Sequence, residues 1–247
     1  EFGASLLQVS LQRHLEILDL LLAPTSADAY LVRMVAFVAE VPRNFFQVME
    51  LLEGPDLFDF IAARSVTVPE QAAAALVQMM ATAVHYVHTR LGIIHRDIKP
   101  ENFGFSRPVP GELASPIPPL KLFDLGLAWA LPQPVAESSA HDMLELQRSG
   151  TPLYMAPEVW RGRCGPPSDV WPVGLITFLL LSLELPFGLL DCRSPMEAVT
   201  KHPLAFVTPC WDAVSQSAKD LIASALDTDP ARRASAGTLL SSSWLLA

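Results

Sequence analysis

One stretch of eight residues, His95-Arg96-Asp97-Ile98-Lys99-Pro100-Glu101-Asn102, limits what this chain can fold into more than any other feature. It brings a candidate base, a cation and an amide that can bind a metal close together in the sequence. The tripeptide His-Arg-Asp alone is common and more often forms a surface turn. Two further pieces follow it, Asp124-Leu125-Gly126 and Ala156-Pro157-Glu158. Composition, order and spacing agree across all three pieces, and this agreement points to one kind of site.

In that order and at that spacing, the three pieces resemble the catalytic loop, the metal-binding motif and the closing motif of protein kinases. The resemblance runs from about Leu6 to the C-terminus and implies an α+β, protein-kinase-like fold with two lobes. Residues 1–52 are expected to form an incomplete small lobe, a helix with few antiparallel strands. Residues 53–247 are expected to form a mainly helical large lobe, with a Pro-rich insertion at 106–119 and an activation segment at 124–158.

Phosphoryl transfer needs positioned cations and a group that receives the proton of the attacking hydroxyl. Asp97 is the candidate for the proton acceptor, and Lys99 can reach the γ-phosphate as a point charge. Asn102 offers an amide oxygen and Asp124 a carboxylate, the hard oxygen ligands that Mg²⁺ prefers. Gly126 gives the backbone the freedom to aim Asp124. The resemblance therefore implies ATP and Mg²⁺, with Asp97, Lys99 and Asn102 catalytic and with Asn102 and Asp124 binding the metal.

The segment from Gly150 to Glu158 is similar to the peptide-positioning loop of Ser/Thr kinases. In that family the Thr of this loop, here Thr151, hydrogen-bonds the catalytic Asp and Lys, which implies transfer to Ser or Thr rather than to Tyr. Asp169 resembles the residue that braces the catalytic loop from a buried helix. The resemblance also implies a structural pair between Glu158 and Arg233, and it leaves Arg232 as a solvated charge.

The sequence from Trp211 to Ile222 and the late Trp244 resemble the calmodulin-dependent and calcium-dependent group of kinases. This implies control by calcium or calmodulin, although these residues contain neither an EF-hand loop nor a calmodulin-binding tail. Residues 48–52 resemble the hinge that binds adenine, with Met49 as gatekeeper; an ordinary buried strand is the alternative. The residues assigned to the nucleotide and substrate side of the site are Met49, Glu50, Leu52, Asp56, Glu101, Gly104 and Asp124.

Asp56 and Glu101 fall where related kinases bind an Arg upstream of the phosphorylated residue. A protein substrate with such an upstream Arg is therefore expected. Each residue also has a simpler interpretation. Asp56 can cap a short helix that runs through Ala63, and Glu101 can be a solvated charge.

Some parts of the family pattern are missing. The first lysine of the chain is Lys99, and only Gly3 precedes Gly54, so neither the strand lysine nor the Gly-rich loop that hold the phosphates is present. His14 stands where the Glu partner of that lysine is expected, unless a shifted register presents Glu16 instead.

Three smaller departures concern the metal motif, the adenine site and the activation segment. Leu125 replaces the usual Phe and can fill the same apolar slot. Gly104 stands where the family places an apolar side chain beneath adenine. A glycine lacks that side chain, and this removes about 1–3 kcal/mol of apolar burial from nucleotide binding. Gln147 stands at the usual phosphorylation site, whose phosphate Arg96 would bind. Two groups can replace the negative charge of that phosphate: Glu145 as a fixed anion, or a phosphate on Ser149.

Three interpretations follow. The chain is part of an active Ser/Thr kinase whose Gly-rich loop and lysine lie upstream, or a pseudokinase that acts as a binding or scaffold module, or a non-catalytic structural domain. As written, the 247 residues are expected to phosphorylate weakly or not at all, because positioning of the phosphates is most of what this chemistry needs.

Composition limits the class of protein, the partners and the cellular location that fit this chain. The chain is 51% hydrophobic and 17% charged, which is typical of a globular protein, and its net charge of −9 argues against nucleic acid or an anionic membrane as partner. The apolar run from Val173 to Leu181 is too short for a bilayer and is expected to be a buried helix. Cys164, Cys192 and Cys210 are expected to be free thiols. The expected location is the cytoplasm, with the nucleus as the alternative.

Patterns of polarity also predict local structure. Helices are expected over 6–22, 56–63 and 69–90 and from Asp169 onward, with a capping box at Ser235 before the last helix. Strands are expected at 30–38, 45–51, 93–94, 102–105 and 120–123, and residues 127–149 are expected to form an irregular loop.

Overall fold

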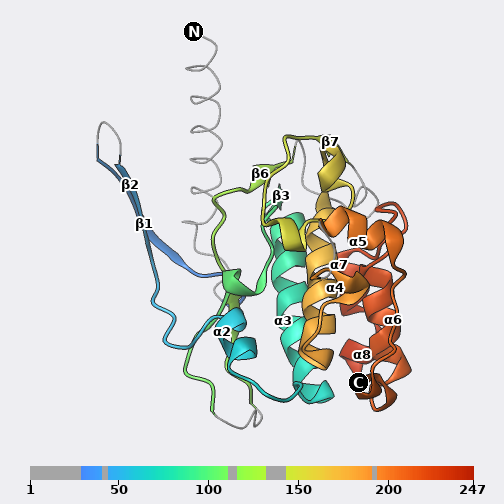
Figure 1. Cartoon of the computed structure of the whole chain (residues 1–247). Helices are drawn as coiled ribbons and strands as arrows, with labels where there is room; N and C mark the ends of the chain where they lie inside the picture. Colours follow the sequence, from blue (N-terminus) through green and yellow to red (C-terminus); the bar gives the residue numbers. More distant parts are fainter. Residues whose placement is uncertain (1–28, 41–43, 111–115, 132–142, 191–193) are drawn as a thin grey trace.

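The computed structural model describes residues 29–40, 44–110, 116–131, 143–190 and 194–247, with a two-stranded hairpin beside a body of helices (Figure 1). The helix predicted over 6–22 lies outside the described residues, together with His14, Glu16 and Cys192. Within the described part of the chain, no helix is long and apolar enough to cross a membrane.

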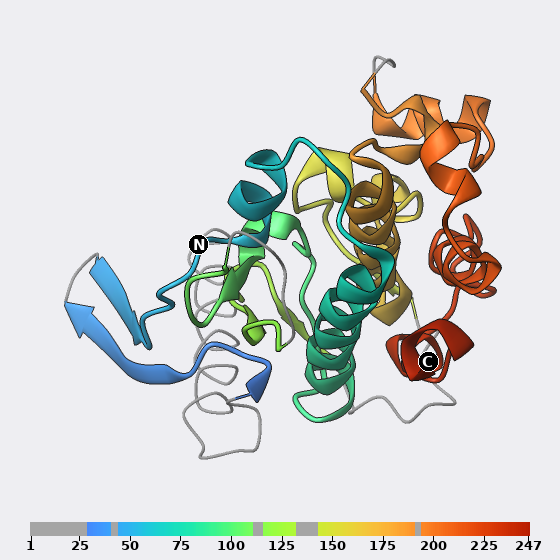
Figure 2. The ribbon, with the colours of Figure 1, turned by 90° about the horizontal axis from the view of Figure 1, so that it is seen from below.

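Two long helices, α3 (Glu70–Thr89) and α4 (Pro166–Ser182), pack against each other at the centre of the helical body (Figure 2). α3 follows Pro69 as predicted. α4 begins at Pro166, three residues before the predicted start, because a Pro in the first turn has no N–H to leave unpaired. Almost every residue of α4 is buried, so the predicted core helix over the apolar run is confirmed.

Gly174 allows α4 to lie close to α6 (Gln216–Ala225). A Cβ atom on Gly174 would lie only 2.8 Å from Cγ of Leu226 and 2.9 Å from Cβ of Ala225. The remaining elements of this body are short: α2 (Leu57–Ala62), α5 (Pro195–Lys201), α7 (Ala236–Leu240), α8 (Ser243–Leu246), and the 3₁₀ turns η2 (Pro100–Asn102), η4 (Pro152–Tyr154), η5 (Val159–Arg161), η6 (Pro186–Gly188) and η7 (Pro209–Asp212).

The described strands pair two by two, and every pair is antiparallel. The predicted strands are confirmed within a few residues. The pairs are β1 (Met34–Glu40) with β2 (Asn44–Met49), β3 (Ile93–Ile94) with β6 (Trp129–Ala130), β4 (Phe103–Phe105) with β5 (Leu120–Leu122), and β7 (Leu144–Glu145) with β8 (Arg163–Cys164).

Two predictions about the second half of the chain are wrong in detail. Residues 127–149 are not wholly irregular, because β6 and β7 lie there and pair with strands far away in the sequence. Ser235 does accept the backbone N–H of Thr238 at 3.1 Å, as a capping residue should, but it caps α7 and α8 still follows.

The β4–β5 ladder has two different faces. Its inner face carries large apolar side chains that belong to the core: Phe103, Phe105, Leu120 and Leu122. Gly104 lies directly opposite Lys121, so these two residues share the other face. Glu50 contacts Lys121, and Leu52 lies against Gly104, so residues 50–52 lie over this face.

Candidate active site

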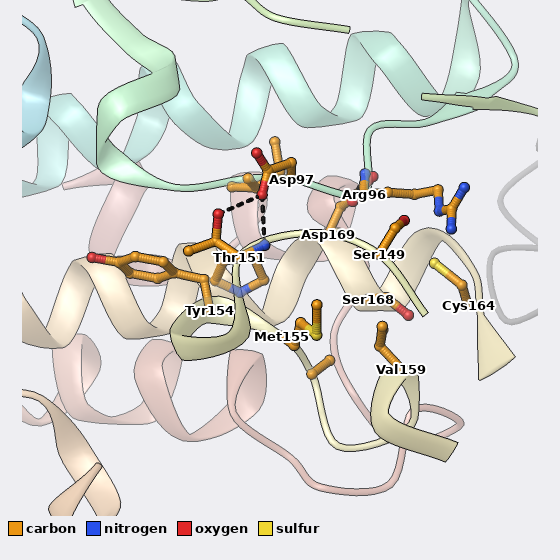
Figure 3. A pocket seen from close by; sticks show the side chains of 13 residues that line it. Arg96, Asp97, Ser149, Thr151, Tyr154, Met155, Val159, Cys164, Ser168 and Asp169 are labelled. Atoms are coloured by element: carbon orange, nitrogen blue, oxygen red, sulfur yellow. Dashed lines mark hydrogen bonds between the residues drawn. The ribbon is translucent and has the colours of Figure 1, made fainter. Parts of the chain in front are cut away.

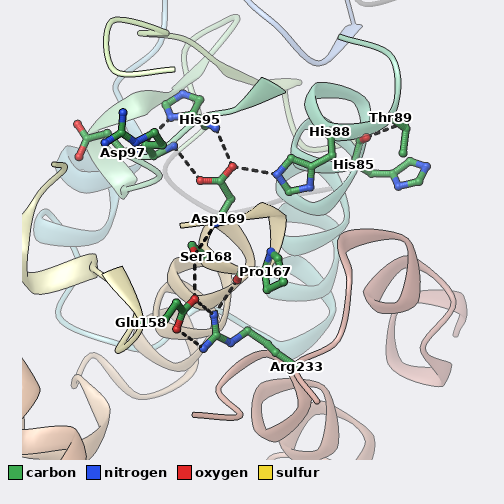
Figure 4. Close-up of polar contacts among 12 residues, drawn as sticks. His85, His88, Thr89, His95, Asp97, Glu158, Pro167, Ser168, Asp169 and Arg233 are labelled. Atoms are coloured by element: carbon green, nitrogen blue, oxygen red, sulfur yellow. Dashed lines mark hydrogen bonds and ion pairs between the residues drawn. The ribbon is translucent and has the colours of Figure 1, made fainter. Parts of the chain in front are cut away.

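Asp169, in the first turn of α4, holds the catalytic loop in shape (Figure 4). Its Oδ2 accepts the backbone N–H of His95 at 2.7 Å, and its Oδ1 accepts that of Arg96 at 2.8 Å. Nε2 of His88, from α3, lies 2.9 Å from the same Oδ2. Arg96 has a φ of 71°, a left-handed conformation that L-residues avoid, and the two backbone hydrogen bonds stabilise it there. The bracing role predicted for Asp169 agrees with these contacts.

Asp97 lies at the meeting point of the catalytic loop and the peptide-positioning loop (Figure 3). Its Oδ1 accepts both the backbone N–H and the hydroxyl of Thr151, each at 2.8 Å. Nζ of Lys99 lies 3.0 Å from Oδ2 of Asp97 and donates to Oγ1 of Thr151 at 3.1 Å. The structure thus brings together the three side chains that the sequence analysis predicted to act as a unit.

The charges of this unit fit a proton acceptor flanked by a cation. Half-burial by itself would raise the pKa of Asp97, but the hydrogen bonds from Lys99 and Thr151 outweigh it and hold the pKa below its usual value. Burial would lower the pKa of Lys99, but the nearby Asp97 carboxylate raises it instead. Near neutral pH Asp97 is therefore ionised and Lys99 is protonated.

Asn102 and Asp124 supply the oxygen atoms expected for a metal. The amide N–H of Asn102 donates to the carbonyl oxygen of Asp97 at 2.8 Å, so the amide oxygen is the atom left to bind a cation. Asp124 has a φ of 62°, and its Oδ1 accepts the N–H of Gly126 at 3.1 Å. Among the described residues, no group of three or more acidic, His or Cys side chains is arranged to hold a metal ion by itself. Mg²⁺ usually takes one or two protein oxygens and completes its shell with phosphate and water, so this pair fits it.

The structural pair predicted from sequence is confirmed (Figure 4). Nη1 of Arg233 lies 2.6 Å from Oε1 of Glu158 and Nη2 lies 2.9 Å from Oε2, so the contact is bidentate. Arg233 also donates to the carbonyl oxygens of Pro167 and Asp227, at 2.8 and 2.9 Å. The side chain of Arg232, by contrast, is 76% exposed and forms a 3.3 Å ion pair with Asp227.

The predicted hinge contains one contact that the sequence analysis missed. Met49 ends β2 and is 41% exposed, so the ordinary buried strand considered for this segment is wrong. Oε1 of Glu50 lies 2.6 Å from Nζ of Lys121, and it also accepts the backbone N–H of Arg33 at 2.7 Å. A buried lysine needs a charged partner. In the sequence, the position of Lys121 between two apolar leucines therefore indicated an ion pair with a carboxylate.

Asp56 and Glu101 have different surroundings. Oδ1 of Asp56 accepts the N–H of Asp59 at 2.8 Å, so Asp56 caps α2 as its simpler interpretation predicted. Glu101 is not the solvated charge that was considered. Its Oε2 is buried and accepts no hydrogen bond from the described residues. Tyr154 lies nearby, and burial together with the negative charge of Glu101 raises the pKa of the Tyr154 phenol.

Arg96 contacts the activation segment through a backbone carbonyl group and an aromatic ring. Its Nη2 donates to the carbonyl oxygen of Gln147 at 2.6 Å, and its guanidinium lies 5.7 Å from the ring centre of Trp129. The described residues contain no ion pair between Arg96 and Glu145, which gives no support to Glu145 as a fixed anion. Oγ of Ser149 is buried, so its phosphorylation would require the segment to open.

A small cavity lies behind the catalytic loop, between that loop and α4 (Figure 3). Asp97, Ser149, Cys164 and Asp169 are among the residues that line it, and its volume of about 20 Å³ is large enough for one water molecule. Burial raises the pKa of the Cys164 thiol to about 12, so this thiol is not a nucleophile near neutral pH. The cavity is far too small for a nucleotide and is part of the packing beneath Asp97.

His95 makes the stability of the loop sensitive to pH. Its ring is fully buried; Nε2 lies 3.2 Å from the carbonyl oxygen of Phe123, and Nδ1 accepts the N–H of Asp97 at 3.3 Å. Burial lowers the pKa of His95 below its ordinary value of 6.5, more than the surrounding carboxylates raise it. The unfolded chain therefore binds this proton first as the pH falls.

We expect the free energy of unfolding to decrease from pH 7 to pH 5, by at most about 1.4 kcal/mol per pH unit from this group. Urea unfolding at pH 5, 6 and 7 measures it. A His95→Gln variant should lose this part of the slope, and a variant of the exposed His202, His202→Gln, should keep it. Equal slopes in all three proteins would contradict the role of His95.

The fold and the site together define the class of this protein. Residues 16–245 match the protein kinase domain family, and the chain belongs to that family.

Its relatives fall in the calmodulin-dependent and calcium-dependent group, as the late sequence motifs predicted. The chain is 37% identical over 207 residues to "Calcium/calmodulin-dependent protein kinase type I" of Schizosaccharomyces pombe, covering 83% of this chain and 58% of that protein. It is 37% identical over 199 residues to "Calcium-dependent protein kinase 7" of Arabidopsis thaliana, covering 81% and 34%. It is 36% identical over 212 residues to "Calcium/calmodulin-dependent protein kinase type IV" of Homo sapiens, covering 84% and 41%. The aligned residues thus span between about a third and somewhat more than half of these relatives.

Proposed function

We propose that this chain is the catalytic body of a Ser/Thr protein kinase, which transfers the γ-phosphoryl group of ATP to a protein hydroxyl. The observation that carries the proposal is the unit of Asp97, Lys99 and Thr151, whose polar atoms lie 2.8–3.1 Å apart. Asp97 is ionised and can accept the proton of a substrate hydroxyl. Lys99 can neutralise charge on the transferred group.

The other residues of the site would bind the metal ion and orient the Asp97 carboxylate. Asn102 and Asp124 would hold Mg²⁺, which neutralises the phosphate charge that develops during transfer. Thr151 occupies Oδ1 of Asp97 with two hydrogen bonds, which fixes the carboxylate and the loop that presents the peptide. A Thr at this place supports Ser or Thr, rather than Tyr, as the acceptor. Incorporation of radioactive phosphate from ATP into Ser, Thr and Tyr peptides by the full-length gene product tests the proposal.

We extend the proposal to a substrate with an Arg upstream of the phosphorylated residue. The buried and unpartnered Oε2 of Glu101 supports it, because a buried carboxylate oxygen without a donor is costly unless a ligand supplies one. A guanidinium is a fitting donor, since it binds carboxylates with parallel N–H groups.

A Glu101→Gln variant should raise the KM for an Arg-containing peptide by about tenfold or more, the usual cost of one charged hydrogen bond, with little change in kcat. Steady-state kinetics with a matched peptide that carries norleucine instead of Arg provide the control, because Glu101→Gln should not affect its KM. A wild-type enzyme that does not distinguish the two peptides would overturn this part of the proposal.

A pseudokinase that binds partners without phosphoryl transfer is the second candidate. It is favoured by Gly104, which stands where the family places an apolar side chain beneath adenine. The two candidates are separated by the Asp97 variant described in the Discussion, since only a kinase depends on that carboxylate for incorporation.

Control by calcium and location in the cytoplasm are parts of the same proposal. Calcium appears in the names of the relatives, and adding Ca²⁺ with calmodulin to the full-length product tests whether it stimulates this protein. The free thiols of Cys164 and Cys210 support a reducing compartment. Imaging of a fluorescent fusion would distinguish the cytoplasm from the nucleus.

A further inference from the structure

A group of three exposed arginines lies beside the peptide-positioning loop. Arg148 comes two residues before Gly150, and Arg161 and Arg163 lie in η5 and at the start of β8. All three side chains are exposed, and within the described part of the chain none of them forms an ion pair. The chain as a whole has a net charge of −9, so this group reverses the sign of the charge locally.

The acidic residues of the same stretch do not neutralise this group. Between residues 143 and 165 they are Glu145 and Glu158. Glu158 is buried and already binds Arg233. Glu145 lies opposite Arg163 in the β7–β8 pair, so it can offset one of the three charges. Arg148 therefore keeps a charge that an anionic ligand can use.

An aromatic ring holds the guanidinium group of Arg148 in place. Its Cζ atom lies 5.0 Å from the ring centre of Trp160, which is within the range of a cation–π contact. Trp160 directly precedes Arg161, so the same contact brings Arg148 next to the other arginines. An ordered guanidinium loses less freedom when it binds a carboxylate, and its fork of N–H groups matches the two carboxylate oxygens.

The backbone places Arg148 close to the reacting groups. A Cβ atom on Gly150 would overlap the carbonyl oxygen of Arg96 and would lie 3.6 Å from Oδ1 of Asp97, so Gly150 lies against the catalytic loop. Arg148 is two residues earlier, and two residues span at most about 7 Å. The long arginine side chain can therefore reach the neighbours of a substrate hydroxyl that lies in front of Asp97.

The position of Arg148 relative to Glu101 determines which part of a substrate it can contact. Figure 3 shows Ser149, the next residue after Arg148, and Tyr154 on opposite sides of Asp97. Glu101 belongs to the Tyr154 side, since burial and then the charge of Glu101 raise the pKa of the Tyr154 phenol. A peptide whose upstream Arg binds Glu101 therefore passes Asp97 and places its following residues near Arg148.

We propose that Arg148 selects substrates with an acidic residue at one or both of the two positions directly after the phosphorylated Ser or Thr. The inference rests on the proposed function, since it names a further feature of the substrates of that kinase. Arg148 is the specificity-determining residue, and Trp160 is a positioning residue that supports it. The substrate then carries a basic residue before the acceptor and an acidic residue after it.

Three peptides test this proposal with the full-length protein and ATP. They share an upstream Arg and a single Ser, and the two residues after the Ser are Asp-Asp, Asn-Asn or Lys-Lys. For the wild type, kcat/KM should be about fivefold higher for the Asp peptide than for the Asn peptide, the upper value for an exposed ion pair, and lowest for the Lys peptide. A higher salt concentration should reduce the Asp-to-Asn ratio, because salt screens exposed charges.

Substitutions of Arg148 separate recognition from a merely structural role. Arg148→Gln should bring the Asp-to-Asn ratio close to one, and Arg148→Glu should reverse the order, so that the Lys peptide becomes better than the Asp peptide. A structural role would lower all three values together and keep their order. Arg107→Gln is the matched control and should keep the wild-type ratio, because Arg107 is exposed and its backbone lies beside Gly54, outside this group.

The remaining outcomes are distinguishable. A wild-type protein that phosphorylates the Asp and Asn peptides equally well, or prefers the Asn peptide, overturns the inference and leaves the kinase proposal intact. A preference for Asp that persists in folded Arg148→Gln also overturns it. Melting temperatures show which variants are folded, and Arg148→Lys, which should keep only part of the ratio, replaces one that is not. A wild-type protein that phosphorylates none of the three peptides overturns the proposed function and the inference with it.

Discussion

Replacing Asp97 with Asn should lower kcat for peptide phosphorylation by about 10²–10⁴-fold, the usual contribution of a positioned general base. The amide keeps the shape of the side chain but cannot accept the proton of the substrate hydroxyl. Its oxygen can still accept the two hydrogen bonds from Thr151. The loop should therefore keep its position, and the KM for ATP should change little. Steady-state kinetics on the full-length product measure both constants.

Asp212→Asn serves as the matched control, because Asp212 is exposed and lies far along the chain at the end of η7. It removes one negative charge in the same chemical way and should leave kcat unchanged. Equal incorporation by the wild type and by Asp97→Asn would show that Asp97 is not the base. Absence of incorporation by both proteins, with nucleotide still bound, would favour the pseudokinase.

Replacing Arg233 with Met should lower the free energy of unfolding by about 3–5 kcal/mol, because it leaves the Glu158 carboxylate buried and unpaired. The side chain of Arg233 is 0% exposed and that of Glu158 is 4% exposed. Met has a similar length and leaves no large cavity, so the loss reports mainly on charge. Arg233 also lies 5.1 Å from the ring centre of Trp171, a further contact that Met replaces only in part. Urea unfolding followed by circular dichroism gives the free energy.

The adjacent residue provides the control for this experiment. Arg232 is 76% exposed, and exposed ion pairs contribute about 0–1 kcal/mol, so Arg232→Met should be close to neutral. Adding Glu158→Gln to Arg233→Met removes the unpaired charge and should restore part of the loss. A loss below about 1 kcal/mol in the single Arg233 variant would contradict the account of a buried charge left alone.

The sequence predicted the long elements well because their signals are local. α3 is marked by Pro69 and a run of Ala, Met and Leu, and α4 by an uninterrupted apolar stretch. β6 and β7 are two residues long and exist only because Ile93–Ile94 and Arg163–Cys164 pair with them. No local pattern encodes such pairing, since it depends on how the chain has already folded.

The same distinction holds for the site. Asp97, Lys99 and Asn102 lie in one short motif, and Thr151 lies in a second motif whose distance from the first was informative. The pair of Lys121 with Glu50 joins residues 71 positions apart, and only the oddity of a lysine in a core strand hinted at it. His88 and the buried oxygen of Glu101 gave no comparable signal, because whether such groups face solvent or another side chain is decided by tertiary packing.

The three hydrogen bonds to Asp169 make the conformation of the catalytic loop depend on the packing of α3 against α4. One carboxylate from α4 joins His88 on α3 to the backbone of His95 and Arg96, so the loop takes its shape only while the two central helices remain in contact. A chain in which α3 and α4 have separated loses the conformation at Arg96 before any residue of the site is altered. Damage at the interface of these helices is therefore expected to distort the loop that carries Asp97 even when every residue of the site is unchanged.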